Sequence, residues 1–126
     1  MPTVMVILPS ATYRASDFVD AAVDLGLDLV VASDAGHGLA GTAGDGFLEV
    51  DCDDAEEAAA AIVAFAAGRP LDAVVAADDG GVVAAALAAE RLGLPHNPPD
   101  AARATRDKAV MRDRLAAAGV PQPAYA

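Results

Sequence analysis

The chain has 126 residues, a length that suits one compact domain. Hydrophobic residues make up 55% of the sequence and charged residues 21%, which excludes an intrinsically disordered chain because such chains are poor in apolar residues. Acidic residues outnumber basic ones by 19 to 8, and the net charge of −11 argues against nucleic-acid binding and against docking on an anionic membrane.

The first part of the chain alternates between strand and helix patterns. Residues 3–8 form a β-branched and apolar run that is typical of a strand buried on both faces. A helix follows, for which Ser16 is a suitable N-cap and Gly26 a suitable left-handed C-terminal residue. The apolar run over 27–32 predicts a second strand, and the glycine-rich residues 37–46 predict a loop.

The same alternation continues through the rest of the apolar body. The remaining elements are, in chain order, a short strand over 47–50, a helix capped by Asp53 or Asp54 and stopped by Gly68 and Pro70, a strand over 72–77 and a helix that runs to Arg91. Strands that alternate with helices of about 10–15 residues predict an α/β fold in three layers. We expect a parallel, Rossmann-like sheet of about four strands with helices on both faces, followed by two short helices.

The C-terminal part of the chain has a different pattern. Residues 98–99 open a short helix, Thr105 caps a second one, and Gly119 begins its stop signal. Five of the eight basic residues lie here: Arg103, Arg106, Lys108, Arg112 and Arg114. We therefore divide the chain into a Rossmann-like domain over residues 1–96 and a helical segment over residues 97–126.

One short stretch matches a dinucleotide-binding fingerprint. Gly36-His37-Gly38-Leu39-Ala40-Gly41 fits G-x-G-x-x-G letter for letter. The fingerprint works as a tight turn between the first strand and a helix whose N-terminus holds the pyrophosphate. Here the match follows the second predicted strand, and the next residues do not begin a helix. A flexible loop is therefore the favoured interpretation, and a nucleotide-dependent oxidoreductase is the alternative.

Two adjacent carboxylates stand where a strand gives way to a helix. Asp78-Asp79-Gly80-Gly81 follows the strand over 72–77, and ligands of open α/β sheets bind at this carboxyl edge. The pair could hold Mg²⁺ or an amine. The simpler interpretation is that one aspartate caps the helix while the glycines allow close packing.

Lys108, the one lysine in the chain, begins the final helix and shares a helix face with Met111 and Leu115. We expect its stem to be partly buried and its ammonium to lie near the helix N-terminus, where a cation gains nothing from the helix dipole. An anionic ligand held between Lys108 and the free helix amides would resolve this mismatch. The alternative is a solvated basic face that pairs with Asp107 and Asp113.

The sequence offers no zinc site and no hydrolase triad. His37 and His96 are far apart without a second ligand at metal spacing, and Cys52 is interpreted as a small buried residue. One cysteine cannot form an internal disulfide, the N-terminus lacks signal-peptide features, and no apolar run reaches the ~18 residues that span a bilayer. We therefore expect a soluble cytoplasmic protein.

Three sequence features follow one another near the C-terminus. They are Gly93-Leu94-Pro95, then Asn97-Pro98-Pro99, then the pattern D-K-x-x-x-x-x-x-L-x-x-x-G-V-P over residues 107–121. In this order they resemble the junction between the N-terminal and nucleotide-binding domains of ATP-grasp ligases, a superfamily that includes biotin carboxylase, glycinamide ribonucleotide synthetase, carbamoyl phosphate synthetase and amino-acid ligases. The preceding body is similar to the N-terminal, pre-ATP-grasp domain of these enzymes, so the resemblance covers essentially the whole chain.

The resemblance implies an ATP-dependent ligase that phosphorylates a carboxylate and then lets an amine or another nucleophile attack the acyl phosphate. It implies that Lys108 contacts the nucleotide phosphates, as the matching lysine does in several members. The substrate-side candidates that it suggests are Ser10, Thr12, Tyr13, Arg14, Asp78 and Asp79. Arg14 would bind the substrate carboxylate, because a guanidinium binds carboxylates bidentately, or else it merely covers the sheet end.

The resemblance also implies parts that this sequence does not contain. A nucleotide-grasping domain with the Mg²⁺ ligands would follow, so residues 97–126 would begin the linker to it and the isolated chain would be inactive. The expected partners are ATP with Mg²⁺ and a small-molecule carboxylate, and such N-terminal domains often take part in homodimer contacts. The alternative is a stand-alone α/β binding or oligomerisation module without catalysis. An exposed apolar surface around Val110, Met111 and Leu115 would favour the missing domain.

Overall fold

The computed structural model describes residues 1–9, 15–34 and 46–125, which include a four-stranded sheet. Its strands are β1 (Thr3–Ile7), β2 (Asp28–Ser33), β3 (Phe47–Glu49) and β4 (Ala73–Ala76). They lie in the order β3-β2-β1-β4, and each neighbouring pair is parallel. The predicted parallel sheet of about four strands is therefore confirmed.

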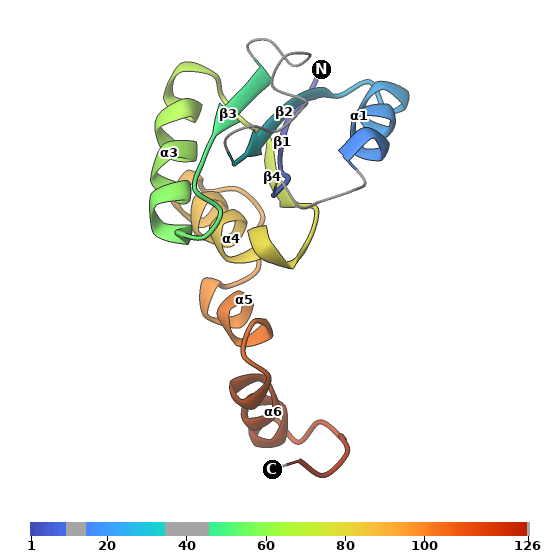
Figure 1. Cartoon of the computed structure of the whole chain (residues 1–126), viewed down its shortest axis with the longest axis vertical. Helices are drawn as coiled ribbons and strands as arrows, with labels where there is room; N and C mark the ends of the chain where they lie inside the picture. Colours follow the sequence, from blue (N-terminus) through green and yellow to red (C-terminus); the bar gives the residue numbers. More distant parts are fainter. Residues whose placement is uncertain (10–14, 35–45, 126) are drawn as a thin grey trace.

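Helices cover both faces of this sheet (Figure 1). The helices of the described chain are α1 (Ala15–Asp24), α3 (Ala55–Gly68), α4 (Val82–Leu92), α5 (Pro99–Thr105) and α6 (Lys108–Ala117), with a short 3₁₀ turn η2 (Asp79–Gly81) before α4. Helices α3 and α4 lie together on one face, and α1 lies on the other. The three-layer α/β fold expected from the alternating pattern is thus present.

The larger core lies under α3 and α4. Met5, Ile7 and Val30 point from the strands into this layer and are fully buried, as is Ile62 of α3. Helix α4 contributes mainly small side chains: its buried residues are Ala84, Ala85, Ala86, Leu87, Ala88 and Ala89. The opposite face has a smaller core, in which Val6, Leu8 and Val31 pack with partly buried residues such as Phe18 of α1.

Most element boundaries follow from local chemistry. Gly26 and Gly93 have φ of 68° and 69°, the left-handed conformation predicted for residues that end helices. Asp54 is the N-cap of α3 and accepts a hydrogen bond from the Glu57 amide at 3.1 Å. Ser16, by contrast, lies inside α1, so its prediction as the N-cap is wrong.

The cap predicted for the last helix is also wrong. Thr105 is the final residue of α5, and its hydroxyl donates to the Ala102 carbonyl at 2.6 Å. Asp107 caps α6 instead, accepting from the amides of Ala109 and Val110 at 3.0 and 3.2 Å. A carboxylate can accept hydrogen bonds from two backbone amides at the start of a helix, whereas the Thr105 hydroxyl already forms a hydrogen bond within α5.

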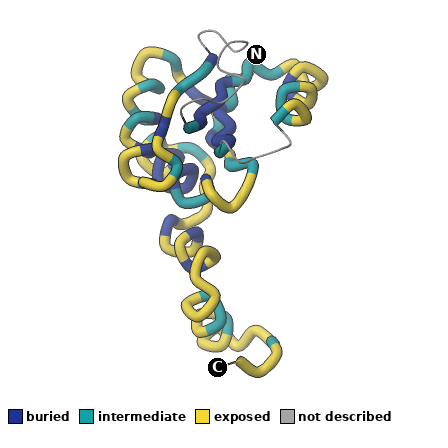
Figure 2. The backbone as a smooth tube through the Cα atoms, in the orientation of Figure 1, coloured by how far each residue is buried: buried dark blue, intermediate teal, exposed yellow. Residues whose placement is uncertain are grey.

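Helices α5 and α6 form an arm that extends away from the sheet (Figure 1). Helix α5 buries Pro99, Ala102 and Ala104, whereas α6 buries no residue, and the tube in Figure 2 is almost wholly exposed beyond α5. The segment after α6 folds back on it, since Tyr125 donates a hydrogen bond to Asp113 at 2.8 Å, which raises the pKa of the tyrosine. The division at residues 96 and 97 stays a prediction.

Candidate functional site

The candidate site lies at the carboxyl edge of β1 and β4, where the turn η2 packs against the end of β1. A Cβ placed on Gly81 would lie 2.8 Å from Cγ2 of Ile7, and one placed on Gly80 would lie 3.1 Å from Cγ of Pro9. Glycine is needed at position 81 for this approach, because no real Cβ tolerates the shorter distance. The turn is therefore held beside the strand end that leads into residues 10–14.

The two adjacent carboxylates have different roles in this turn. Asp78 is the N-cap of η2, and its Oδ1 accepts from the Gly80 amide at 2.8 Å. Asp79 points outward with a side chain that is 89% exposed, and it forms an ion pair with Arg106 at 3.8 Å. The helix-capping interpretation is thus correct for Asp78, and Asp79 is the carboxylate that faces solvent and a cation.

Several predicted residues lie outside the described part of the chain. These are the substrate-side candidates Ser10, Thr12, Tyr13 and Arg14 and the fingerprint residues 36–41. The described residues on either side place Pro9 next to Gly80. Because β1 and β4 are neighbours, the chain leaves β1 at the same edge of the sheet that carries Asp78 and Asp79.

Lys108 is the first residue of α6 and is exposed, where the sequence analysis expected its stem to be partly buried. The difference arises because α6 packs against α5 but against no other described element to a comparable extent. Met111 and Leu115 are half-buried, and Val110 is 41% exposed. Helix α6 therefore carries an exposed Lys108 and an apolar strip, formed by Val110, Met111 and Leu115, that is not fully buried.

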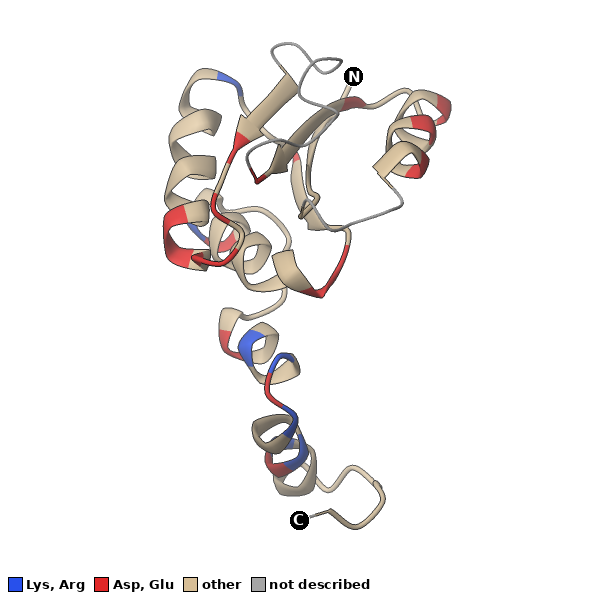
Figure 3. Ribbon diagram, in the orientation of Figure 1, with Lys and Arg blue, Asp and Glu red and all other residues tan. Residues whose placement is uncertain are grey.

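A network of arginines was missed by the sequence analysis. Glu56 in the first turn of α3 pairs with Arg91 of α4 and, at 3.2 Å, with Arg103 of α5. Figure 3 shows that Lys and Arg gather on α5 and α6, whereas Asp and Glu predominate on the rest of the described chain. The concentration of basic residues near the C-terminus was the available signal, but their acidic partners are distant in sequence and only the fold brings them together.

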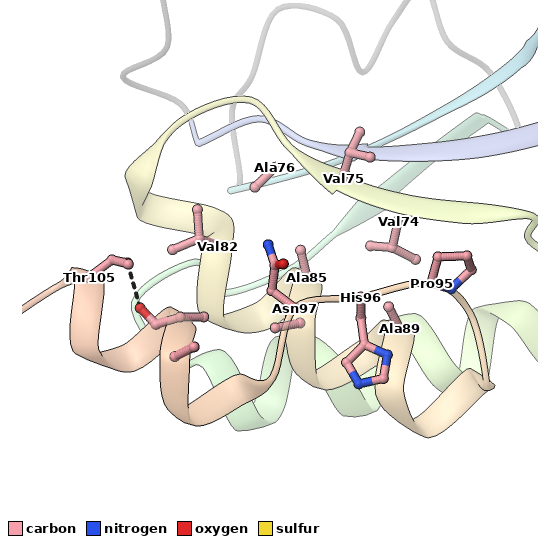
Figure 4. Close-up of a pocket in the computed structure, with 13 residues that line it drawn as sticks. Val74, Val75, Ala76, Val82, Ala85, Ala89, Pro95, His96, Asn97 and Thr105 are labelled. Carbon is pink, nitrogen blue, oxygen red and sulfur yellow. Dashed lines mark hydrogen bonds between the residues drawn. The ribbon is translucent and has the colours of Figure 1, made fainter. Parts of the chain in front are cut away.

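One cavity, of about 640 Å³, lies between β4 and the helices α4 and α5 (Figure 4). Valine and alanine side chains form most of its walls, and its lining contains no Asp, Glu, Lys or Arg. Nδ1 of the His96 ring donates a hydrogen bond to the Leu94 carbonyl, 2.9 Å away, and Nε2 of the same ring lies 3.6 Å from the Glu90 carboxylate. Neither Asp79 nor Lys108 lines this cavity.

A second cavity of about 500 Å³ lies beyond the ends of β2 and β3. Its acidic lining residues are Asp34, Glu49, Asp51, Asp53 and Glu57, which disfavour a phosphate there. In the described part of the chain, however, no three His, Cys, Asp or Glu side chains are grouped closely enough to hold a metal ion. The longest described helix, α3, has 14 residues, and none of the described helices could span a bilayer.

Cys52 is half-buried, and we predict that its thiol is unreactive. Burial is the main cause that raises its pKa to about 12, with a hydrogen bond to Asp34 and nearby carboxylates adding to the effect. At pH 8 we expect iodoacetamide to alkylate it about 30- to 60-fold more slowly than an ordinary cysteine, because the thousandfold loss of thiolate is only partly offset by greater nucleophilicity. Intact mass measured over time would show this, and equal rates in native and urea-unfolded protein would contradict it.

Comparison with known proteins gives a consistent set of matches. The sequence model of the ATP-grasp N-terminal domain matches residues 19–96. The structure is similar to an L-amino acid ligase from Bacillus licheniformis, with a TM-score of 0.75 and 20% identity, over 98% of this chain and 32% of that one. It is also similar to a phosphoribosylglycinamide synthetase from Anaerococcus prevotii, with a TM-score of 0.73 and 17% identity, over 91% of this chain and 28% of that one.

The two structural matches establish the fold alone, because sequence identities of 20% and 17% are too low to carry a function over. The chain spans about a third of the length of each of these solved chains. No curated protein sequence matches it.

Proposed function

The chain belongs to the ATP-grasp N-terminal domain family, and on this premise we propose that it forms the substrate side of an ATP-dependent carboxylate ligase. The observation that carries the proposal is the placement of η2, with Asp79 exposed, against the end of β1. Ligands of open α/β sheets bind at this edge. The substrate would lie between this turn and residues 10–14, with Ser10, Thr12 and Tyr13 as polar contacts.

The proposed reaction has two steps. A carboxylate oxygen of the substrate attacks the γ-phosphorus of ATP, and ADP leaves, which gives an acyl phosphate. An amine or another nucleophile then attacks the carbonyl carbon, and phosphate departs with the former carboxylate oxygen. In this scheme Arg14 binds the carboxylate and Lys108 binds the nucleotide phosphates, because cations stabilise the charge of a phosphoryl group in transfer.

The family implies Mg²⁺ as well as ATP, but the described residues do not fit a complete metal site. Among the residues that the structure describes, no three potential ligands are grouped, and Asp79 has the cation of Arg106 beside it. We therefore derive no step through a metal from these residues. The metal ligands would lie in a nucleotide-binding domain outside this chain.

Helix α6 supports the proposal over a stand-alone binding module. It buries no residue, and it leaves Val110 exposed next to the half-buried Met111 and Leu115. Such an apolar strip on an arm fits contact with a further domain. The homodimer, the cytoplasmic location and the inactivity of the isolated chain all remain predictions.

Isotope transfer tests the reaction directly. Carboxylates would be screened with the full-length ligase for ADP release, and the best substrate would be labelled with ¹⁸O in its carboxylate. We expect one ¹⁸O atom in the released phosphate, because the acyl phosphate gives up that oxygen. The 126-residue chain alone is the control and should release no phosphate. Unlabelled phosphate, or release of AMP with labelled oxygen, would contradict an acyl phosphate.

A further inference from the structure

The candidate residues Asp79 and Lys108 are connected through Arg106. Helices α5 and α6 are separated by two residues, Arg106 and Asp107, which form the bend between them. The guanidinium of Arg106 lies 3.8 Å from the Asp79 carboxylate, so the bend itself is tied to the sheet edge. Lys108 begins α6 immediately after this bend.

A second ion pair ties the same helix to the body. Arg103 lies one turn before Arg106, and its guanidinium is 3.2 Å from the carboxylate of Glu56 on α3. Residues three apart share one face of a helix, so α5 is held on that face by two acids from different elements. Beyond the bend, α6 has α5 as its main described neighbour and buries no residue. The direction of α6 therefore depends on how α5 and the bend are held.

We propose that Arg106 is a positioning residue: its ion pair with Asp79 sets the direction in which α6, and Lys108 with it, leaves the carboxyl edge of the sheet. The role that this gives to Lys108 rests on the proposed function. An anionic ligand that binds Arg106, or a cationic one that binds Asp79, competes with the pair. Binding of a ligand at the sheet edge thereby changes the direction of α6.

The ion pair between Arg106 and Asp79 is weak because both side chains are exposed to solvent. Arg106 is 50% exposed and Asp79 is 89% exposed, so water and salt compete with the pair. A pair of this kind changes the ratio of held to released arm by up to about fivefold. An ion pair of that strength keeps α6 in one orientation in most molecules, and a bound ligand can still disrupt it.

The arm can be measured in the chain itself by the distance between two spin labels. Exposed residues on α3 and α6 would carry them, introduced as Ala64→Cys and Ala117→Cys in a Cys52→Ser background. We expect Arg106→Gln and Asp79→Asn each to broaden the distance distribution relative to the parent. High salt should broaden the parent distribution as well, because it screens exposed charges. Arg114→Gln removes the same charge from α6 without touching either tether and should change nothing.

The charge-reversed double variant, Asp79→Arg with Arg106→Asp, separates an ion pair from simple packing. It should restore the narrow distribution. The proposal is overturned if the single variants keep the parent distribution, or if the double variant stays as broad as the singles. No nucleotide enters the measurement, so it can fail while the ligase proposal stands, and the reverse is equally true.

Discussion

Replacing Lys108 with alanine in the proposed full-length ligase is expected to lower kcat/KM for ATP by about 10- to 100-fold. The loss is that of one hydrogen bond between a charged donor and a phosphate, which is typical of this magnitude. Lys108→Arg should recover part of the loss, because arginine keeps the charge but not the compact geometry of the ammonium. Initial rates at varied ATP concentration would measure both variants.

The structure makes this experiment easy to interpret. Lys108 is exposed and α6 buries no residue, so the variant should keep the fold and the thermal midpoint of the parent. Arg114→Ala is a matched control, since this residue also lies on α6, is exposed, and forms no ion pair with any residue that the structure describes. Unchanged kinetics in Lys108→Ala would remove Lys108 from the mechanism, and an equal loss in Arg114→Ala would point to the charge of the arm instead.

The second large effect concerns stability. Ile62→Ala should lower the free energy of unfolding by about 2–5 kcal/mol, as removal of a buried large aliphatic side chain does when a cavity remains. The expected loss is large here because Ile62 is fully buried and the other buried residues of α3, Ala58 and Ala59, are small. A domain of this size has about 5–15 kcal/mol in total, so the variant would lose a large share of it.

Urea denaturation followed by circular dichroism would test the Ile62 prediction. The midpoint should fall clearly while the slope stays the same, since the surface exposed on unfolding hardly changes. Val23→Ala on α1 removes an apolar side chain that is 73% exposed, and it should leave the midpoint nearly unchanged. If both variants had the parent's midpoint, Ile62 would not be the anchor that its burial indicates.

The sheet was predictable from the sequence because its signals are local. The apolar run at 3–8 is long enough to be buried on both faces, and Gly26 and Gly93 mark helix ends that only a left-handed residue can make. That one of the two adjacent aspartates is a cap was predictable for the same reason, and the structure identifies Asp78 as that residue. Each of these features depends on residues within a few positions of one another.

The site depended on contacts that local patterns do not contain. Arg106 and Asp79 are far apart in sequence, and the residues around each of them give no indication that the two form an ion pair. The exposure of Lys108 was missed because helix periodicity gives the face of a side chain but not whether another element covers that face. Thr105 was chosen as a cap from residue type alone, and its hydroxyl bonds backward to Ala102 instead.

The alanine-lined packing of α4 has a consequence for how this protein can vary. At the buried positions Ala84, Ala88 and Ala89 almost every substitution adds atoms, and only glycine removes them. Added methylenes in a close-packed layer push side chains off their rotamers and shift the backbone, at a cost of about 1–3 kcal/mol each. We therefore expect larger residues to be accepted at these positions only where the neighbouring helix α3 loses side-chain volume at the same time.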